Sequence, residues 1–335
     1  MLFLHRLGTF ECRLKRKLIN MFYQNKSVLV AGGSGLIGTH LVQALLNRGA
    51  KVRATLHQKP AQIHDDRIEY LSCDLTRRED CDRAVAGVDY VFLCAASTSG
   101  AAVMAHNPIA HITSNLLINS QILEAACLAK VERLLFVSST TVYPAVSYPV
   151  KEEEAFVGDP HASYMGVGWM KRYIEKLAQF YYERYGMKIA LVRPTNAYGP
   201  FDKFDFETSH VLPALIRRAL EKQDPFEVWG DGTAVRDFVY ISDLTDALLA
   251  ALEHCANCEA INFGSGQPIT IRQAVEVILK LTRHTGKTIF DASKPTTIPI
   301  RLVDLTKAKE LLNCQPKVSF EEGIKNTIEW YCQKK

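Results

Sequence analysis

Residues 28–38 decide the fold, and they read Val28-Leu29-Val30-Ala31-Gly32-Gly33-Ser34-Gly35-Leu36-Ile37-Gly38. A short apolar run leads into glycines spaced three apart, and a helical apolar pattern follows. Glycine permits the positive φ of a tight turn and lets a diphosphate approach bare backbone at the start of a helix. Because strand, turn and helix follow in this order, the pattern predicts a dinucleotide whose pyrophosphate lies against Gly32, Gly35, Leu36, Ile37 and Gly38.

Outward from this stretch, the same alternation of strand and helix patterns continues. Short β-branched and apolar runs recur at 52–55, 90–94, 134–137 and 189–192, with longer stretches of helical period between them. Runs of this kind, buried on both faces, indicate a parallel sheet covered by helices on each side. After residue 195 the pattern becomes irregular. The predicted fold class is α/β: a Rossmann-type doubly wound parallel sheet with a smaller, mixed α/β substrate-binding lobe.

Three regions are predicted along the chain. Residues 1–26 form a basic N-terminal extension, and 27–195 form an NAD(P)-binding Rossmann domain to which 236–263 returns. Residues 196–335 form mainly the substrate-binding lobe. The extension is interpreted as a plain tail or an upstream start before Met21, with a short amphipathic helix or a basic membrane-surface contact as alternatives.

The net charge of +4 over 335 residues belongs to that extension. Residues 1–26 hold six basic side chains and one acid, which leaves 34 basic and 35 acidic residues elsewhere. A neutral body argues against nucleic acid as a partner, since phosphate backbones need a basic face. Because no run of 18 apolar residues occurs, no transmembrane segment is expected.

Nine cysteines are scattered without a repeating spacing. An odd number of cysteines, several of them in apolar strand-like runs, indicates a reduced, cytoplasmic protein. One Cys-x-x-Cys pair, Cys255 and Cys258, has no second pair, and a zinc site needs four ligands. No metal is therefore expected.

The end of the second predicted strand bears on the choice of cofactor. NAD-binding proteins usually place an acid there for the ribose hydroxyls. Residues 51–59 contain no acid, and Arg53, His57 and Lys59 are positioned to meet a 2′-phosphate instead. The sequence favours NADP(H), with NAD as the alternative.

These features resemble the extended short-chain dehydrogenase/reductases, also called the NAD-dependent epimerase/dehydratase family, over residues 27–332. The matching segments are Cys73-Asp74-Leu75, Leu93-Cys94-Ala95-Ala96, Val137-Ser138-Ser139-Thr140-Thr141-Val142-Tyr143 and Arg193-Pro194-Thr195-Asn196-Ala197-Tyr198-Gly199-Pro200. The resemblance implies cofactor contacts at Asp74, Leu75 and Ala95, and a catalytic serine at Ser139.

Residues 209–218 and 228–238 resemble members that epimerise and reduce nucleotide-linked 4-keto sugars. The resemblance implies a nucleotide-diphosphate sugar as the ligand and a homodimer formed through helices near 107–128 and 164–185. It also implies that arginines pair with the diphosphate, that an amide lines the substrate pocket and that a tryptophan packs on the base or sugar. The residues concerned are Arg218, Arg236, Asn196 and Trp229, with Lys294 as a further candidate.

The family's reductive step uses a tyrosine four residues before a lysine on one helix. The helix pattern around 168–175 makes Lys171 that lysine, which would also contact the nicotinamide ribose, but position 167 is Val167. Valine has no proton to give. Tyr164 is the nearest substitute, yet on a continuous helix it stands about 10.5 Å from Lys171 along the axis instead of about 6 Å. It would serve only if the helix started late and the chain folded back.

Epimerisation in the resembling enzymes uses a cysteine and a histidine. His210 matches the histidine, whereas Thr141 occupies the cysteine position. A thiol exchanges protons near neutral pH far more readily than an alkyl hydroxyl.

The sequence leaves two classes of function open. One is an NADP(H)-dependent nucleotide-sugar reductase or epimerase/reductase with an unusual proton donor, with an NAD-dependent UDP-sugar 4-epimerase as the alternative within that class. The other is a protein that binds cofactor or nucleotide sugar and is catalytically impaired by Val167, whether natural or engineered.

Overall fold

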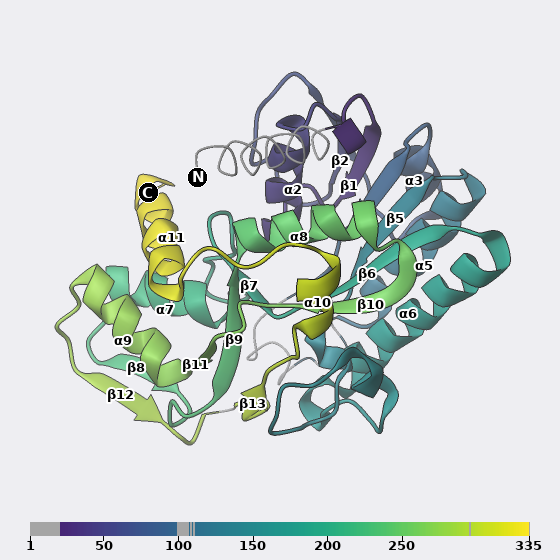
Figure 1. Cartoon of the computed structure of the whole chain (residues 1–335). Helices are drawn as coiled ribbons and strands as arrows, with labels where there is room; N and C mark the ends of the chain where they lie inside the picture. Colours follow the sequence, from purple (N-terminus) through teal and green to yellow (C-terminus); the bar gives the residue numbers. More distant parts are fainter. Residues whose placement is uncertain (1–20, 99–106, 108, 110, 295, 335) are drawn as a thin grey trace, which may run out of the picture.

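A computed structural model describes residues 21–98, 107, 109, 111–294 and 296–334 (Figure 1). Its first lobe is built on a seven-stranded, wholly parallel sheet in the order β10-β6-β5-β4-β1-β2-β3. The strands are β1 (Ser27–Ala31), β2 (Lys51–Leu56), β3 (Ile68–Ser72), β4 (Tyr90–Leu93), β5 (Arg133–Val137), β6 (Lys188–Pro194) and β10 (Asn257–Phe263).

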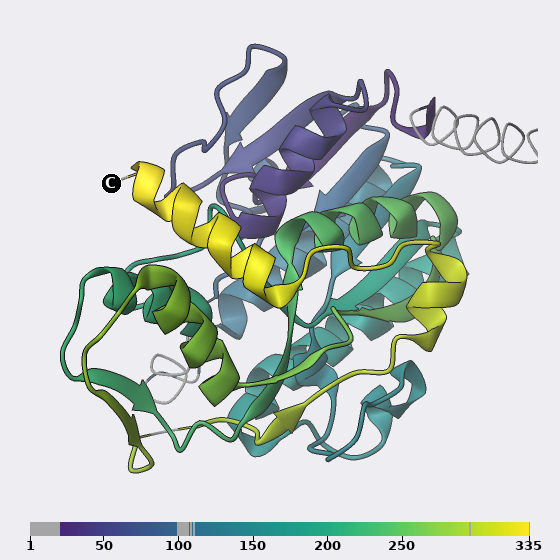
Figure 2. The same cartoon turned by 60° about the vertical axis from the view of Figure 1, so that its left-hand side comes forward.

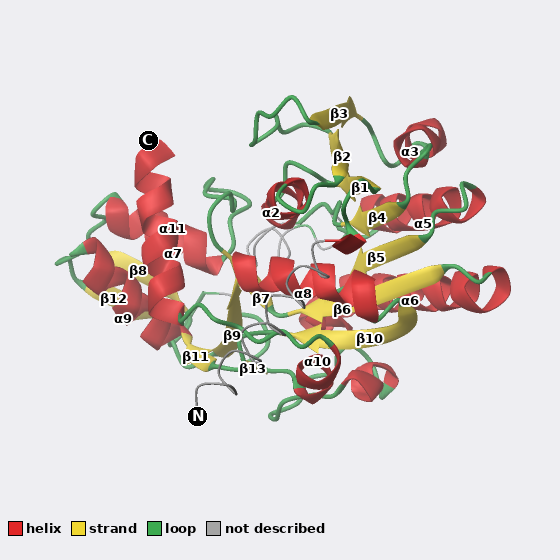
Figure 3. Cartoon of the chain, turned by 45° about the horizontal axis from the view of Figure 1, so that its top comes forward, coloured by secondary structure: helices red, strands yellow, loops and turns green. Residues whose placement is uncertain are grey.

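Helices cover both faces of this sheet (Figure 3). Strand side chains alternate between two cores, so that Val28 and Val30 of β1 face one core and Leu29 and Ala31 the other. The first core is closed by α2 (Leu36–Leu46) and α8 (Ile241–His254). The second is closed by α3 (Arg78–Val85), α5 (Thr113–Leu128) and α6 (Met165–Tyr185). The predicted doubly wound Rossmann-type sheet is confirmed.

The second lobe is smaller and mixed, as predicted. A four-stranded sheet contains β7 (Asn196–Tyr198), β9 (Val235–Tyr240), β11 (Pro268–Thr270) and β13 (Ile300–Arg301), and β8 (Phe226–Trp229) pairs with β12 (Thr288–Asp291). Its helices are α7 (Val211–Leu220), α9 (Ile271–Thr282) and α11 (Phe320–Lys334), while α10 (Thr306–Leu311) lies near β10. Figure 2 shows α11 running between the two lobes, where Trp330 packs on Phe201.

Two of the predicted domain boundaries differ slightly from the limits that the packing of the lobes shows. Tyr23 is 1% exposed, and its hydroxyl donates to the Leu249 carbonyl of α8, so the packed lobe begins before residue 27. Within 236–263, α8 and β10 lie in the first lobe, whereas β9 belongs to the four-stranded sheet. Most of the predicted extension, residues 1–20, lies outside the described part of the chain.

Candidate functional site

The turn after β1 is shaped by backbone contacts that only glycine allows. Gly32 has a φ of +91°, and a Cβ there would lie 2.8 Å from Cα of Ala95. A Cβ on Gly38 would lie 2.0 Å from the Gly32 carbonyl oxygen. Helix α2 starts at Gly35 without any side-chain cap, so its first N–H groups are open to an anion. The turn therefore fits a dinucleotide diphosphate.

Strand β2 supports this turn from beneath. The Gly32 N–H donates to Oγ1 of Thr55 at 2.9 Å, and the Gly33 N–H donates to the Thr55 carbonyl at 3.0 Å. Thr55 is 3% exposed, so these bonds are shielded from water. Sequence reasoning missed Thr55, because a threonine in a strand gives no local signal of the glycine it supports. Leu36 and Ile37 remain partly exposed at the start of α2, beside the open N–H groups.

The end of β2 carries fewer free cations than the sequence suggested. Arg53 donates from Nε to Glu69 at 2.8 Å and from Nη1 to the Ala86 carbonyl at 2.6 Å. The Arg53 guanidinium thus ties β2 to β3 and to the end of α3, and its contact with a 2′-phosphate stays a prediction. His57 and Lys59 are exposed at the strand end.

Asp74, after β3, lies on the same side as His57. Its carboxylate accepts from the Thr76 hydroxyl at 2.7 Å and from the Thr76 N–H at 3.1 Å. These bonds, together with the charge of His57, hold the pKa of Asp74 below its ordinary value. Leu75 is buried among the core residues of α3, so its side chain serves packing and a cofactor contact there would have to come from its backbone.

Ser139 follows the carboxyl end of β5, and the side chain of Lys171 reaches the last residue of that strand. Lys171 Nζ donates to the Val137 carbonyl at 2.9 Å, two residues before Ser139. Burial lowers the pKa of Lys171 to about 8, although the carboxylate of Glu175 opposes this shift. Ser139 Oγ accepts from the Thr141 N–H at 3.1 Å and caps the 3₁₀ turn η1 (Thr140–Val142). Val167 stands one turn before Lys171 on α6 and packs against the second core.

Tyr164 lies outside helix α6, which does start late. It ends the 3₁₀ turn η3 (Ala162–Tyr164), and α6 begins at Met165. The Tyr164 ring lies 4.0 Å from the guanidinium of Arg301, and its charge also acts on Arg236. Tyr164 therefore faces the second lobe and groups with its arginines.

His210 is the residue that precedes α7. Desolvation, followed by the charges of Lys203 and His111, lowers the pKa of His210 to about 4. Its imidazole is therefore neutral at pH 7 and can accept a proton. Thr141 Oγ1 is buried and has no hydrogen-bond partner in the described part of the chain. Its hydroxyl is available to a ligand, but no described group activates it as a base.

Arg236 and Arg301 form a cationic pair that sequence reasoning only half found. The two residues are register partners on β9 and β13, and burial and then the charge of Arg301 lower the pKa of Arg236 to about 10. Arg236 is held by the carbonyls of Val235 and Pro299 and by the Thr297 hydroxyl. Neither arginine forms an ion pair with a described carboxylate, so a diphosphate would supply the missing countercharge.

The other predicted substrate residues are dispersed. Arg218 donates to the carbonyls of Ala214 and Glu227, which ties α7 to β8 within the second lobe. Asn196 donates its amide to the Asp237 carbonyl at 2.9 Å. Trp229 is 39% exposed at the end of β8, and Lys294 is exposed in the turn after β12. The structure brings Asn196 and Arg236 onto paired strands, whereas Arg218, Trp229 and Lys294 lie on other elements of the lobe.

Two contacts bring the second lobe over the carboxyl edge of the sheet. One is the Tyr164–Arg301 contact, and the other is a bond from Lys203 Nζ to the Thr98 carbonyl at 2.6 Å, beyond β4. Strands β1 and β4, where the order of the sheet reverses, end beneath this region. Ligands of open α/β sheets bind at such a switch point.

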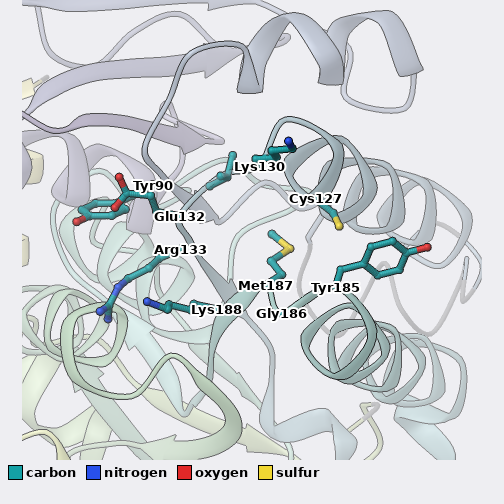
Figure 4. A pocket seen from close by; sticks show the side chains of 10 residues that line it. Tyr90, Cys127, Lys130, Glu132, Arg133, Tyr185, Gly186, Met187 and Lys188 are labelled. Atoms are coloured by element: carbon teal, nitrogen blue, oxygen red, sulfur yellow. The ribbon is translucent and has the colours of Figure 1, made fainter.

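A hollow of about 460 Å³ opens at the opposite edge of the sheet (Figure 4). Its lining includes Tyr90, Arg133 and Lys188, at the amino ends of β4, β5 and β6. It holds none of the predicted site residues. Among the described residues no cluster of side chains could hold a metal ion, and none of the described helices has the length and apolarity to cross a bilayer.

Fold and site together define a two-lobed α/β protein with a dinucleotide-binding turn and an arginine-lined second lobe. A model of the NAD dependent epimerase/dehydratase family matches residues 28–264, and the chain belongs to this family.

Three known proteins illustrate the similarity. A GDP-L-fucose synthase of Sinorhizobium fredii is 32% identical, over 91% of this chain and 95% of that enzyme. The UDP-glucose 4-epimerase of Thermotoga maritima, solved with UDP-glucose, has a TM-score of 0.83 and 28% identity, covering 92% of this chain and 99% of its own. A GDP-D-glycero-L-gluco-heptose synthase of Campylobacter jejuni, solved in the presence of NADPH, has a TM-score of 0.77 and 25% identity, covering 92% and 98%. The family members that residues 209–218 and 228–238 resemble in sequence are the GDP-L-fucose synthases, and this resemblance is confirmed.

Proposed function

We propose that this protein is an NADP(H)-dependent reductase, or epimerase/reductase, of a nucleotide-linked 4-keto sugar. The observation that carries the proposal is the placement of an unpaired arginine pair, Arg236 and Arg301, in the lobe that reaches over the carboxyl edge bearing the glycine turn and Ser139. Two sites for diphosphates on one edge suit a cofactor and a nucleotide sugar that react with each other. The similarity to GDP-L-fucose synthase supports the same ligand class.

Each residue of the site has a proposed part in this reaction. The turn from Gly32 to Gly38 and the start of α2 hold the cofactor diphosphate, and the cofactor supplies a hydride when bound. Ser139 donates a hydrogen bond that polarises the sugar carbonyl. His210, neutral at pH 7, accepts a proton from the carbon beside the ketone if the enzyme also epimerises. Arg236 and Arg301 bind the sugar diphosphate.

The proposed cofactor is NADP(H). The end of β2 carries no acid, and His57 and Lys59 remain exposed there after Arg53 is assigned to Glu69. The C. jejuni relative was solved in the presence of NADPH, which supports this choice. NAD remains the alternative, and comparing the binding of the two cofactors by calorimetry decides between them.

The direct test mixes the purified protein with NADPH and a GDP-linked 4-keto-6-deoxy sugar and follows absorbance at 340 nm. We expect oxidation of NADPH and one new hydroxyl on the sugar. A Ser139→Ala variant should lose about 100-fold in kcat and keep its affinity for NADPH. Absence of turnover across GDP-, UDP- and dTDP-linked keto sugars would contradict the proposal.

Two observations favour other readings. The T. maritima neighbour was solved with UDP-glucose, which supports an NAD-dependent UDP-sugar 4-epimerase. Such an enzyme would be purified with tightly held NAD and would interconvert UDP-sugars without net oxidation of NADPH. Val167 supports the other reading, a protein that binds its ligands without turnover. Binding by the native chain together with turnover only in a Val167→Tyr variant would establish it.

Partner and location follow as proposals. The ligand is a nucleotide-diphosphate sugar, nucleic acid is not a partner, and a second copy of the chain completes a homodimer. Eight cysteines lie in the described part of the chain, and all are free thiols. This state supports a cytoplasmic location, because thiols persist in a reducing compartment.

A further inference from the structure

Of the tyrosines near Ser139, one has its hydroxyl engaged and the other stacks on an arginine of the second lobe. The Tyr143 hydroxyl is buried, donates to Asn262 Oδ1 at 2.5 Å and accepts from Arg193 at 2.8 Å. Tyr164 presents its ring to Arg301 of the second lobe. With valine at position 167, a proton for a carbonyl beside Ser139 must come from another group.

Lys171 is an acidic group held at the end of β5, at a residue that lies two positions before Ser139 along the chain. Its side chain is 8% exposed and lies 4.5 Å from the Phe136 ring, and its Nζ makes one hydrogen bond, to the Val137 carbonyl, within the described part of the chain. An ammonium carries three protons. Two of the Nζ protons are therefore not committed to a described acceptor.

Glu175, one turn further along α6, is not a partner that would hold those protons. Its carboxylate accepts from Arg193 Nη2 at 2.6 Å, from Arg193 Nε at 2.9 Å and from the Ser138 hydroxyl at 2.5 Å. Glu175 and Arg193 are 4% and 3% exposed, so they form a buried ion pair. Both oxygens of Glu175 are therefore taken by Arg193 and Ser138, although its charge still acts on Lys171.

We propose that Lys171 itself gives the proton to the carbonyl oxygen of the sugar. This inference rests on the proposed reductase function. In the step the carbonyl carbon accepts a hydride, the C=O double bond becomes a single bond, and the oxygen takes one proton from the Lys171 ammonium. The products are an alcohol, oxidised cofactor and a neutral lysine amine, which water then reprotonates.

The surroundings of Lys171 suit a proton donor. Burial lowers its pKa to about 8, while Glu175 on the same helix and Cys94 beyond β4 oppose the shift. Arg193 of β6 acts on Lys171 through Glu175, and buried Arg172 of α6 also interacts with Glu175. General acids work best when their pKa lies near the working pH. An ammonium with a pKa of about 8 gives up its proton more readily than a phenol with an ordinary value near 10.

The hydrogen bond from the Ser138 hydroxyl to Glu175 positions Ser139 and Lys171, the two groups that act in the step. Ser138 precedes Ser139 at the end of β5, and Glu175 follows Lys171 by one helical turn. This bond fixes the distance between the strand end and the helix, so Ser138 and Glu175 are positioning residues. A Ser138→Ala variant should have a KM raised less than fivefold and a kcat lowered about tenfold. The substitution loosens the orientation of Lys171 relative to Ser139, whereas the residues that bind the substrate remain.

The test compares the native protein with Lys171→Arg, using NADPH and the keto sugar that serves as substrate. Arginine keeps the positive charge but holds its proton, since its pKa lies above 12. We expect the native kcat to fall tenfold per pH unit above about pH 8. The Lys171→Arg variant should have a kcat about 100-fold lower at pH 7, and its kcat should no longer fall above about pH 8. This fall is the alkaline limb of the pH profile. The affinity of the variant for NADPH should change less than tenfold. Lys176→Met, on the exposed face of the same helix, is the matched control and should match the native protein.

A second readout does not need turnover. Acetylation of Lys171 by a water-soluble acetylating reagent, followed by peptide mass spectrometry across pH 6–11, should show half-reaction near pH 8. Acetylation of Lys176, on the exposed face of the same helix, is the internal reference. Half-reaction of Lys171 near 10 would overturn the proposal.

The outcomes of these experiments distinguish a failure of this inference from a failure of the proposed function. If Val167→Tyr is active and the native protein is silent at every pH, the reaction class stands and Lys171 is not the acid. If neither protein turns over any nucleotide-linked keto sugar, the proposed function fails. If Tyr164→Phe abolishes the alkaline limb and Lys171→Arg retains it, the donor is Tyr164 and the inference is wrong.

Discussion

At the scale of single residues, the sequence pointed to some site residues and gave no sign of the partners of others. Lys171 could be assigned because the helix register around it follows a family pattern. The partner of Arg53 could not be predicted, because its strand position says only which face it occupies and Glu69 lies on the neighbouring strand. Arg301 was missed because a lone arginine in a short strand has no local signature. Only the pairing of β9 with β13 sets it beside Arg236.

Arg301 yields the first prediction. An Arg301→Met variant should bind a nucleotide diphosphate, with GDP and UDP as probes, about 10- to 100-fold more weakly, because a charge-assisted hydrogen bond contributes about 1.5–3 kcal/mol. NADPH affinity should not change. Calorimetry measures both. Arg272→Met is the control, since that exposed guanidinium stacks on Phe290 of the same lobe. Equal losses in both variants would refute a specific role for Arg301.

Asp202 yields a prediction about pH. Burial raises the pKa of Asp202 to about 7, against the opposing N–H and charge of Lys203, and its Oδ2 has no partner among the described residues. The folded state therefore holds a proton that the unfolded chain releases near pH 4, so stability falls as pH rises from 4 to 7.

An Asp202→Asn variant removes this dependence. We expect it to be more stable than the native protein by about 1–3 kcal/mol at pH 8 and equal to it near pH 4. Chemical unfolding at the two pH values is the measurement. A stability difference that does not change with pH would show that Asp202 is ionised throughout.

At the scale of elements, most strands and helices could be predicted from the sequence, because the spacing of apolar residues differs sharply between the two. The runs at 28–31, 52–55, 90–94, 134–137 and 189–192 all fall on strands of the sheet. Strand β3 was not anticipated, because only Ile68 of its five residues is buried and the apolar signal is weak. The start of α6 at Met165 could not be fixed, since its preceding 3₁₀ turn continues the same helical pattern.

The glycine turn after β1 yields a prediction at this scale. A Thr55→Val variant keeps the shape of the side chain but leaves the Gly32 N–H without its acceptor. An unpaired buried donor costs about 1–3 kcal/mol, so the free energy of unfolding should fall by that amount and NADPH affinity should fall with it. Thr282→Val is the control, because its hydroxyl bonds only carbonyls of its own helix. Equal effects in both would mean that Thr55 does not support the turn.

At the scale of the whole molecule, the sequence predicted two lobes but not how they meet. The contacts that close the carboxyl edge join residues far apart in the chain, Tyr164 with Arg301 and Lys203 with Thr98. Such pairs follow from the path of the connections over the sheet, and no local pattern encodes them. The site was therefore predicted as two separate halves, and its assembly is a property of the fold.

A homodimer is the last prediction, and it follows from one face of α6. Met165, Trp169, Tyr173 and Phe180 are 41%, 46%, 53% and 47% exposed. Spacings of four, four and seven residues place all four on one side of the helix. A contiguous apolar stripe of this kind marks an interaction surface on a folded protein.

We expect sedimentation to give twice the chain mass at micromolar concentration. Phe180→Glu should shift the protein to a monomer, whereas Ile289→Glu, which adds the same charge to an exposed site on β12, should leave it dimeric. A native protein that sediments as a monomer would assign the stripe to another partner.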